Sequence, residues 1–372
     1  MTDMKPWAFE LEGYIREGEP DRARRAELWQ VAIGLQDVDG LAPSQYLLDT
    51  AKEHIEGELS IDQVQSRIAA YYQQRDERTQ AELESEEADV VSSRIAEILG
   101  ERAFTFSPSE LKSIHGRLFK GLLKEAGAYR RYNITKNEWV LKGDTVRYSS
   151  WNIVPETLEY DFEKEGAFSY QGLSKLEVAR HIAAFASGIW QIHPFCEGNT
   201  RTTAVFIIKY LNAMGLEIGN EPFADHSWYF RNALVRANYT NLDQDVHETN
   251  RYLEAFFENA LLGASHDLKN RYLHIDWVSE AQSAKSDSPK CKVPENGGAF
   301  GCTLEELAVL KLLDADPTMT QKALATKLGV SERTIKTRTV QLQEKGLLAR
   351  AGGKRNGRWV VSGDVGSADS SR

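Results

Sequence analysis

Residues 193–202 concentrate the side chains of this chain that are best suited to chemistry. The segment reads His-Pro-Phe-Cys-Glu-Gly-Asn-Thr-Arg-Thr and holds an imidazole at His193, a carboxylate at Glu197 and a guanidinium at Arg201. An imidazole can take a proton from a hydroxyl, a carboxylate can hold a hard cation such as Mg²⁺, and an arginine can bind phosphate through two parallel hydrogen bonds. These groups are the components that a phosphoryl or nucleotidyl transfer requires.

The same segment can also bind an anion through its backbone. Gly198 and Asn199 tolerate backbone angles that other residues avoid, so consecutive N–H groups can point into one concave nest. Residues 173–192 and 202–214 carry apolar residues at helical spacing, and the start of the second helix would add its positive end. A plain helix–loop–helix turn is the alternative, but six suitable residues within nine positions favour a site.

Size and composition set limits on the kind of protein. The 372 residues allow two or three domains, and a hydrophobic fraction of 41% is typical of a globular protein with a core. Because no apolar run has membrane-spanning length and the N-terminus lacks a signal pattern, we expect a cytoplasmic protein without a membrane partner. The three cysteines, at positions 196, 291 and 302, fit neither a metal site nor a disulfide framework. The net charge of −10 excludes a nucleic-acid-binding surface over the whole chain.

Helical patterns dominate the elements that must position this segment. Residues 6–96 predict three or four amphipathic helices, Ser107-Pro108-Ser109-Glu110 has the residues of a helix start, and two further helices are expected at about 228–238 and 246–262. Residues 132–153 differ, because aromatic and β-branched residues flank a polar break at 142–144. That pattern predicts a β-hairpin, packed along the helices as a flap.

The segment resembles the defining motif of the Fic family, His-x-Phe-x-(Asp/Glu)-Gly-Asn-Gly-Arg-x-x-Arg. Six positions match it: His193, Phe195, Glu197, Gly198, Asn199 and Arg201. The resemblance extends from about residue 96 to 262, and residues 127–130 resemble the turn that precedes the family's flap. It implies a Fic-type helical core that carries the predicted hairpin.

Most Fic proteins transfer AMP from ATP to a Ser, Thr or Tyr hydroxyl of a protein. The resemblance implies that His193 is the base for that hydroxyl and that Glu197 holds Mg²⁺ on the phosphates of ATP. Four consecutive residues would form the anion hole: Gly198, Asn199, Thr200 and Arg201. Tyr229 and Asn238 match positions that line the family's adenosine pocket, and Tyr148 in the flap is a further nucleotide contact. Aromatic residues at this spacing also occur in helix cores, so both interpretations of Tyr229 stay open.

Two positions depart from the family motif. Thr200 replaces the second glycine and narrows the allowed backbone angles, and Ala204 replaces the final arginine, which grips the terminal phosphate or pairs with an inhibitory glutamate in the family. The N-terminal region resembles the small antitoxin-like module that restrains some Fic domains, with Asp39 and Gly40 in place of its Glu-Gly pair. Because Asp39 is one methylene shorter than Glu and position 204 offers no arginine, we expect a helical cover more than active inhibition.

The C-terminal region predicts a different fold. Three helical patterns between 303 and 345 and two short strand patterns between 347 and 361 have the order of a winged helix-turn-helix. Residues 331–358 hold eight Lys or Arg against two Glu, a local charge of +6. The residues expected to contact DNA are Arg333, Lys336, Arg338, Lys354 and Arg355. Winged helices also bind proteins, so a protein-docking module stays open as the alternative.

The sequence therefore predicts a mainly α protein, with a Fic-type helical core, a β-hairpin flap and a C-terminal winged helix domain. The expected parts are an antitoxin-like region (1–95), the Fic domain (96–262), a linker (263–300), the winged helix (301–363) and a disordered tail (364–372). The expected activity is Mg²⁺-dependent transfer of AMP from ATP to a protein target, which can be the chain itself. A DNA-binding regulator that only senses nucleotide and a different phosphoryl-type transferase are the alternatives. DNA and a second copy of the chain complete the expected partners.

Overall fold

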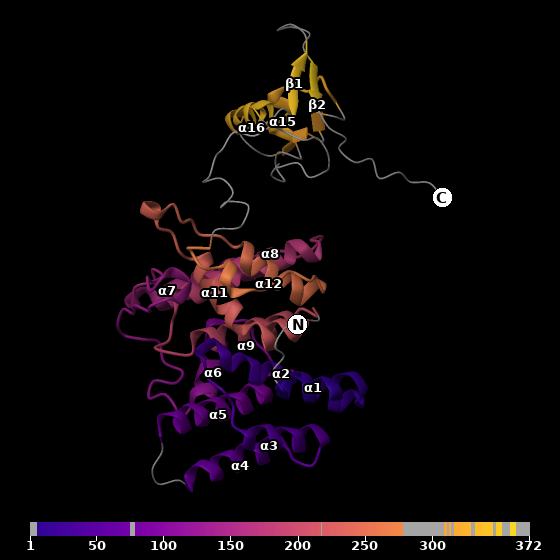
Figure 1. Cartoon of the computed structure of the whole chain (residues 1–372). Helices are drawn as coiled ribbons and strands as arrows, with labels where there is room; N and C mark the ends of the chain where they lie inside the picture. The colour runs from indigo at the N-terminus through magenta and orange to yellow at the C-terminus, as the bar shows by residue number, and fades with distance from the viewer. Residues whose placement is uncertain are drawn as a thin grey trace, which may run out of the picture. The chain divides into compact units, whose positions relative to one another are not determined.

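The computed structural model describes residues 6–74, 79–216 and 218–277 and, in the C-terminal part, 309–310, 312–313, 316–328, 332–344, 347–351 and 358–361. The chain divides into two compact units, Met1–Asp287 and Ser288–Arg372, each with its own elements (Figure 1). The described residues of the first unit form helices joined by irregular loops, and the second unit combines helices with a two-stranded sheet. The predicted mainly α fold is confirmed.

Five α-helices form the described N-terminal part of the first unit, where the sequence predicts three or four. They are α1 (Pro6–Glu17), α2 (Pro20–Gly34), α3 (Gln45–Glu56), α4 (Ile61–Gln73) and α5 (Gln80–Gly100). The short 3₁₀ helix η1 (Leu35–Asp39) ends at Gly40 with a φ of 70° and turns the chain from α2 towards α3. Helices α3, α4 and α5 are capped by Ser44, Ser60 and Thr79, whose hydroxyls each accept a backbone N–H of the first helical turn.

The remaining helices of the first unit surround the motif segment. They are α6 (Pro108–Phe119), α7 (Val154–Gly166), α8 (Lys175–Ile192), α9 (Asn199–Ala213), α10 (Glu221–Asp225), α11 (Ser227–Ala237) and α12 (Arg251–Leu262). As the sequence predicts, Ser107 starts α6 by accepting the N–H of Glu110 at 3.1 Å. Helix α9 begins three residues earlier than expected, so its first turn lies inside the motif. Helix α12 begins later, because Val246 pairs with Asn241 in an isolated bridge.

One apolar core joins the N-terminal helices to the helices around the motif. Trp29 of α2, Phe119 of α6, Trp190 of α8 and Phe206 of α9 are buried in the same cluster. Helix α2 packs on α5 and α10, α6 packs on α9, and α8 packs on α12. Removing α1–α5 would therefore expose the apolar faces of the helices that hold the motif.

The predicted β-hairpin at residues 132–153 is wrong. The described residues of this segment contain no strand; they form irregular loop with the 3₁₀ helices η2 (Trp139–Leu141) and η3 (Trp151–Ile153). The chain still reverses, since the N–H of Glu138 donates to the carbonyl of Asp144 at 2.9 Å. Val140 and Val146 are buried in the core, so the apolar residues that resemble a strand serve a packed loop instead.

Residues 263–277, which the sequence assigns to the linker, pack on the first unit. Leu268 and Leu273 lie in its core, and the segment includes the 3₁₀ helix η5 (Asn270–Tyr272). The N–H of Ile275 donates to the carbonyl of Val140 at 2.9 Å. The segment thus braces the irregular loop. The rest of the proposed linker, residues 278–300, lies outside the described residues.

The second unit confirms the predicted winged helix-turn-helix. Helices α15 (Gln321–Leu328) and α16 (Glu332–Glu344) precede the antiparallel strands β1 (Leu348–Ala351) and β2 (Arg358–Val361). Ile335, Leu342 and Leu348 pack in a separate small core, as the sequence predicts. Trp359 closes it, since its indole N–H donates to the carbonyl of Met319 at 3.2 Å. The helix expected at 303–313 is described only at 309–310 and 312–313, and the wing tip and tail lie outside the described residues.

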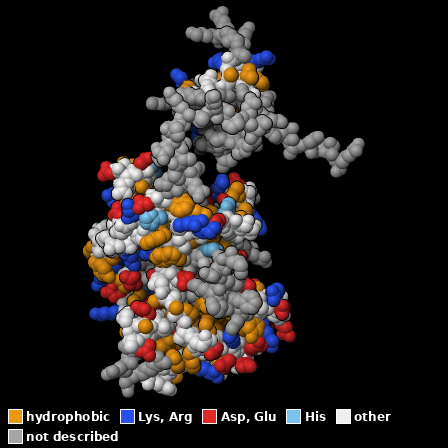
Figure 2. Space-filling model, viewed as in Figure 1, with side chains coloured by type: hydrophobic (Ala, Val, Ile, Leu, Met, Phe, Trp, Pro, Cys, Tyr) orange, Lys and Arg blue, Asp and Glu red, His pale blue; other side chains and the backbone are white. Residues whose placement is uncertain are grey.

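The surface of the first unit carries both signs of charge. Figure 2 shows acidic and basic side chains mixed with apolar ones over its visible face. Within the described residues, no helix has the length and apolar character needed to cross a membrane.

Candidate active site

His193 ends helix α8 in a left-handed backbone conformation, with a φ of 50°. Such an angle is costly for a residue with a Cβ, so it persists only where the surroundings fix it. The guanidinium of Arg130 does so: its Nε donates to the carbonyl of His193 at 2.7 Å, and its other nitrogens donate to the carbonyls of Tyr132, Ser149 and Ile192. The N–H of Arg130 also donates to the carbonyl of Pro194 at 2.9 Å. Both the side chain and the backbone of the buried Arg130 therefore hold the start of the motif loop.

The imidazole of His193 has one committed nitrogen and one uncommitted nitrogen. Nδ1 lies 3.2 Å from the carbonyl of Trp190, which can only accept, so we assign the proton to Nδ1. Nε2 then carries a lone pair, and this buried atom has no hydrogen-bond partner among the described residues. Burial, and next the charge of Lys136, lowers the pKa of His193 well below its usual range. The ring is thus held as the neutral tautomer that a general base requires.

Two aromatic rings shape the surroundings of the imidazole. The rings of Tyr148 and His193 lie 4.2 Å apart between centroids, and the ring of Trp190 lies edge-on at 5.2 Å. The Tyr148 hydroxyl donates to Glu138 at 3.2 Å. The predicted nucleotide contact Tyr148 therefore lies beside the predicted base, with its ring on the imidazole and its hydroxyl turned to the loop.

A second histidine supports the motif loop from below. The His115 ring stacks on the Phe195 ring with centroids 3.8 Å apart. Its Nδ1 accepts the N–H of Gly127 at 2.8 Å, so its Nε2 carries the proton and donates to the carbonyl of Glu197 at 3.1 Å. Burial lowers the pKa of His115 to about 4. His115 therefore stays neutral at pH 7 and ties α6 to the loop.

The start of α9 has the backbone geometry that the predicted anion nest requires. Gly198 is the N-cap residue with a φ of 70°, and no side chain caps the helix within the described structure. A helix start without a cap leaves its first N–H groups available to an anion. Asn199 contributes backbone only, because its side chain donates to the carbonyl of Phe195 and accepts the N–H of the same residue, both at 2.9 Å.

Thr200 fits the nest despite replacing a glycine. Its backbone is helical, so the position does not need the angles that only glycine adopts readily. Its hydroxyl accepts the indole N–H of Trp190 at 3.0 Å. Because Trp190 also holds His193, this bond connects the nest to the base.

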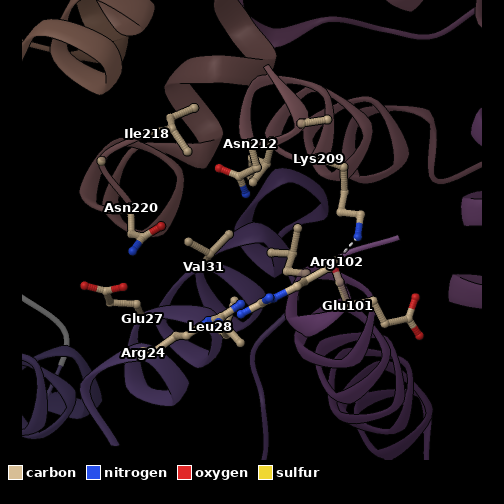
Figure 3. A pocket seen from close by; sticks show the side chains of 14 residues that line it. Arg24, Glu27, Leu28, Val31, Glu101, Arg102, Lys209, Asn212, Ile218 and Asn220 are labelled. Atoms are coloured by element: carbon tan, nitrogen blue, oxygen red, sulfur yellow. Dashed lines mark hydrogen bonds between the residues drawn. The ribbon is translucent and has the colours of Figure 1, made fainter. Parts of the chain in front are cut away.

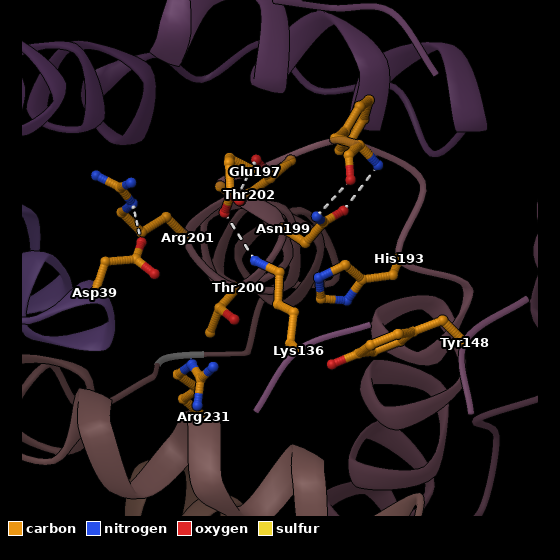
Figure 4. A network of polar contacts seen from close by, with 12 residues as sticks. Asp39, Lys136, Tyr148, His193, Glu197, Asn199, Thr200, Arg201, Thr202 and Arg231 are labelled. Atoms are coloured by element: carbon orange, nitrogen blue, oxygen red, sulfur yellow. Dashed lines mark hydrogen bonds and ion pairs between the residues drawn. The ribbon is translucent and has the colours of Figure 1, made fainter. Parts of the chain in front are cut away.

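Arg201 is not free to bind phosphate in this structure. Its side chain is 3% exposed and is held by three residues of the N-terminal helices: Asp39, Gln36 and Glu87. The Arg201 nitrogens lie 2.6 Å from Glu87 and 3.0 Å from Gln36. Nε lies 2.9 Å from Asp39 without a well-aligned hydrogen bond, so this contact is an ion pair. The sequence offers Asp39 no arginine at position 204; the structure pairs it with the other motif arginine instead (Figure 4).

Glu197 meets a lysine of the irregular loop. Lys136 Nζ lies 2.7 Å from Glu197 Oε2, and the carboxylate side chain is 59% exposed. Figure 4 shows Lys136 reaching across the start of α9 beside His193. The described residues contain no group of three or more His, Cys, Asp or Glu side chains placed to hold a metal. An exposed carboxylate beside a phosphate nest still fits a Mg²⁺ ion whose other ligands are phosphate oxygens and water.

A buried ion pair anchors the irregular loop to α11. Arg231 places two nitrogens on the fully buried carboxylate of Glu138, at 2.6 and 3.2 Å. Arg231 also lines a cavity of about 370 Å³ beside Asp39, Gly40 and Trp228. The loop is thus held over the motif by charge-assisted hydrogen bonds, without a β-ladder.

The two residues expected at the adenine lie with other elements. Tyr229 is 3% exposed and lines a separate cavity with residues of α12 such as Tyr252. The side-chain amide of Asn238 donates to Ser187 Oγ and to the carbonyl of Leu234, each at 2.9 Å. Neither residue is tied to the 193–201 loop by a described hydrogen bond. Their nucleotide role stays a prediction.

Sequence reasoning missed several residues that shape the site, because they lie far from the motif along the chain: His115, Lys136, Glu138, Gln36 and Glu87. Arg130 and Arg231 lie in segments that the sequence analysis discusses, but no role was predicted for either side chain. Gln36 and Glu87 lie 165 and 114 residues from Arg201. Nothing local in the sequence marks such partners.

Comparison with known families agrees with this geometry. Residues 105–211 match the Fic/DOC family. The chain contains a Fic/DOC domain. Its members generally transfer nucleotide or phosphate groups, and the matched region spans the loop, α8 and α9. Residues 306–349 match the winged helix-turn-helix DNA-binding family, which agrees with the second unit.

Similar solved structures are also Fic proteins. They include the N-terminal FIC domain of Bep8 from Bartonella sp. 1-1C, at 20% identity and a TM-score of 0.40, over 50% of this chain and 88% of that one. A Fic family protein from Desulfovibrio desulfuricans G20 has 15% identity and a TM-score of 0.37, over 98% of each chain. BepC from Bartonella tribocorum, with bound AMPPNP, has 19% identity and a TM-score of 0.38, over 48% and 85%. The search of curated proteins gave no match.

Proposed function

We propose that the Fic domain transfers AMP from ATP to a hydroxyl side chain of a protein, which can be the chain itself, with release of pyrophosphate. The observation that carries the proposal is the buried, unpartnered Nε2 of His193 beside the uncapped start of α9. A buried nitrogen without a partner is costly and persists where function needs it. A base next to an anion nest is the arrangement that this transfer requires.

The residues of the chain support each part of the reaction. The N–H groups of residues 198–201 would bind the α-phosphate and stabilise charge that develops on it. A target hydroxyl gives its proton to His193 Nε2 as its oxygen bonds to the α-phosphorus, and the bond from that phosphorus to the bridging oxygen breaks to release pyrophosphate. Mg²⁺, held by Glu197, would supply charge neutralisation on the phosphate oxygens.

The described contacts support a restrained form of this enzyme. Arg201 is occupied by Asp39, Gln36 and Glu87, and Glu197 is occupied by Lys136. For Arg201 to reach phosphate, η1 and α5 must release it, and for Glu197 to hold a cation, Lys136 must turn away. We therefore assign Asp39 to a restraint that acts on the first motif arginine, with Gly40 ending the 3₁₀ helix that carries Asp39.

Mass spectrometry after incubation with isotopically labelled ATP and Mg²⁺ tests the proposal. We expect the wild-type chain to add AMP to itself or to a protein mixture, and His193→Ala to add none. His247→Ala is a matched control, because this exposed histidine pairs with Asp245 outside the loop. Addition of phosphate would instead support a different phosphoryl-type transferase. Nucleotide binding without any transfer would support a regulator that senses nucleotide.

The winged helix match favours a second function for the second unit. We propose that it binds duplex DNA through α16 and the wing, with Lys336 exposed on that helix and Arg338 partly buried beside it. The side chain of Arg333 and residues 354–355 lie outside what the structure describes. ATP and DNA are both present in the cytoplasm, where we place the chain. A second copy of the chain would let two modules bind one site.

A further inference from the structure

A cavity of about 880 Å³ lies away from the motif loop, between α2, the residues that follow α5 and the C-terminal half of α9. Figure 3 shows its walls: Arg24, Glu27 and Leu28 come from α2, Glu101 and Arg102 follow α5, and Lys209 and Asn212 belong to α9. Its lining includes no residue of the 193–202 segment. The proposed transfer chemistry does not use it.

Two guanidiniums face this cavity without a hydrogen bond or a close ion pair in the described structure. Arg24 and Arg102 both line it, and Figure 3 shows their side chains extending towards each other across its floor. Neither forms an ion pair or hydrogen bond with any residue of the described structure. Two like charges directed at one space repel each other, and an anion between them would remove that repulsion.

The acidic residues of the cavity do not cancel this charge. The carboxylate of Glu101 is taken by Arg117, with nitrogen–oxygen distances of 2.6 and 2.7 Å. Burial raises the pKa of the Glu27 carboxyl, while its hydrogen bond with Asn220 and the nearby charge of Arg24 oppose that shift. Glu27 therefore offsets at most one of the three cations, Arg24, Arg102 and Lys209, that line the cavity. A net positive site is left.

A third cation is built into the wall. Lys209 is 4% exposed, and its ammonium donates to the carbonyls of Ile98 and Glu101 at the end of α5. This lysine caps α5, where a positive charge interacts favourably with the helix dipole. These two carbonyls hold the ammonium at the cavity wall without depending on a ligand.

The remaining lining suits an organic molecule. Leu28, Val31 and Ile218 offer apolar surface, and the amides of Asn212 and Asn220 offer donors and acceptors. The volume is larger than an inorganic ion needs. Ligand sites commonly combine an apolar wall with a few convergent polar groups.

We propose that this cavity binds a small organic anion, a phosphate- or carboxylate-bearing metabolite whose charge lies between Arg24 and Arg102. The same two helices lead to the motif: α2 continues into η1, which holds Arg201, and α9 carries that arginine in its first turn. Because the ligand would contact both helices, its binding stabilises the packing of the N-terminal helices on the Fic domain.

Calorimetric titration of the full chain tests the proposal with glycerol 3-phosphate and succinate as anionic probes and glycerol as the neutral control. The test variant is Arg24→Gln with Arg102→Gln. The matched variant is Arg16→Gln with Arg180→Gln, which removes the same charge from exposed side chains outside the cavity. Thermal unfolding of both variants checks that they are folded.

We expect wild type and the matched variant to bind at least one anion and not glycerol, with affinity at least about tenfold weaker in the test variant, because charge-assisted bonds to guanidinium are lost. Binding of only one probe tells whether the site takes phosphate or carboxylate. Absence of binding to both anions up to about 10 mM, a negligible affinity, overturns the proposal. So does equal affinity in the test variant, which would place the anion at another site such as the start of α9.

Discussion

Replacing Gly198 by alanine tests whether tight packing, as well as backbone angle, fixes the start of the phosphate nest. Gly198 has a φ of 70°, and an added Cβ would lie 2.3 Å from two carbons of the buried Phe119 ring. The left-handed angle alone costs about 1–2 kcal/mol for a residue with a Cβ. Overpacking against the ring adds about 1–3 kcal/mol. We therefore expect G198A to lower the free energy of unfolding of the first unit by about 2–5 kcal/mol.

Gly215→Ala is the matched control for this experiment. Gly215 has a φ of 74°, but no described atom lies within 4 Å of the position its Cβ would take. Its replacement carries the cost of the angle without the clash, about 1–2 kcal/mol. Urea unfolding followed by tryptophan fluorescence measures both variants. AMP transfer should also fall in G198A, because the displaced loop carries the nest, and should change little in G215A.

Equal losses of stability in the two variants would refute the packing argument. Such a result would mean that the Phe119 ring moves aside at little cost and that the positive φ alone accounts for the need for glycine at position 198. A second variant makes the test sharper. Phe119→Leu in the G198A background removes the ring carbons that the new Cβ meets, so it should recover part of the loss if the clash is real.

Four further predictions concern charge. Glu197→Gln keeps the side-chain size, and we expect AMP transfer to fall at least about a hundredfold, roughly 3 kcal/mol of barrier, in a Mg²⁺ titration; an unchanged titration excludes this residue as the metal ligand. Asp39→Ala leaves the motif arginine with two other partners, so transfer should rise no more than about fivefold, since a part-exposed ion pair contributes about 0.2–1 kcal/mol; a hundredfold gain, about 3 kcal/mol, would contradict this. His115 has a pKa of about 4 in the folded chain, below its value in the unfolded chain, so its contribution to the free energy of unfolding is full above pH 6.5 and falls by about 3 kcal/mol as the pH drops towards 4. In urea unfolding, His115→Gln should therefore show a weaker dependence of stability on pH than wild type. An unchanged pH dependence would contradict the lowered pKa. For Lys336→Ala with Arg338→Ala, we expect the slope of log affinity for duplex DNA against log salt concentration to fall by an amount equal to about two phosphate contacts. Fluorescence anisotropy of the full chain measures this slope. A slope equal to that of wild type would mean that DNA binds at other residues.

Features that depend on local chemistry could be predicted from the amino-acid sequence. The helix start at Ser107 follows from its capping residue. The motif was predicted to lie between two helices because apolar periodicity stops before His193 and resumes at residue 202. The winged helix could be predicted for the same reason, since its helices, turn and strands are each encoded within a few residues.

Which charged side chains are free to bind a ligand depends on contacts that form only in the folded chain. Arg201 has the same sequence context whether it binds phosphate or the N-terminal helices, and its partners come from 114 and 165 residues away. Glu197 likewise meets Lys136 only after the loop folds over α9. The loop was itself mistaken for a hairpin, because buried irregular backbone and strands use the same apolar residues. The same physical reason applies to Arg201, Glu197 and the loop. The spacing of apolar residues determines local backbone conformation, whereas burial and ion pairing depend on residues that only folding brings together.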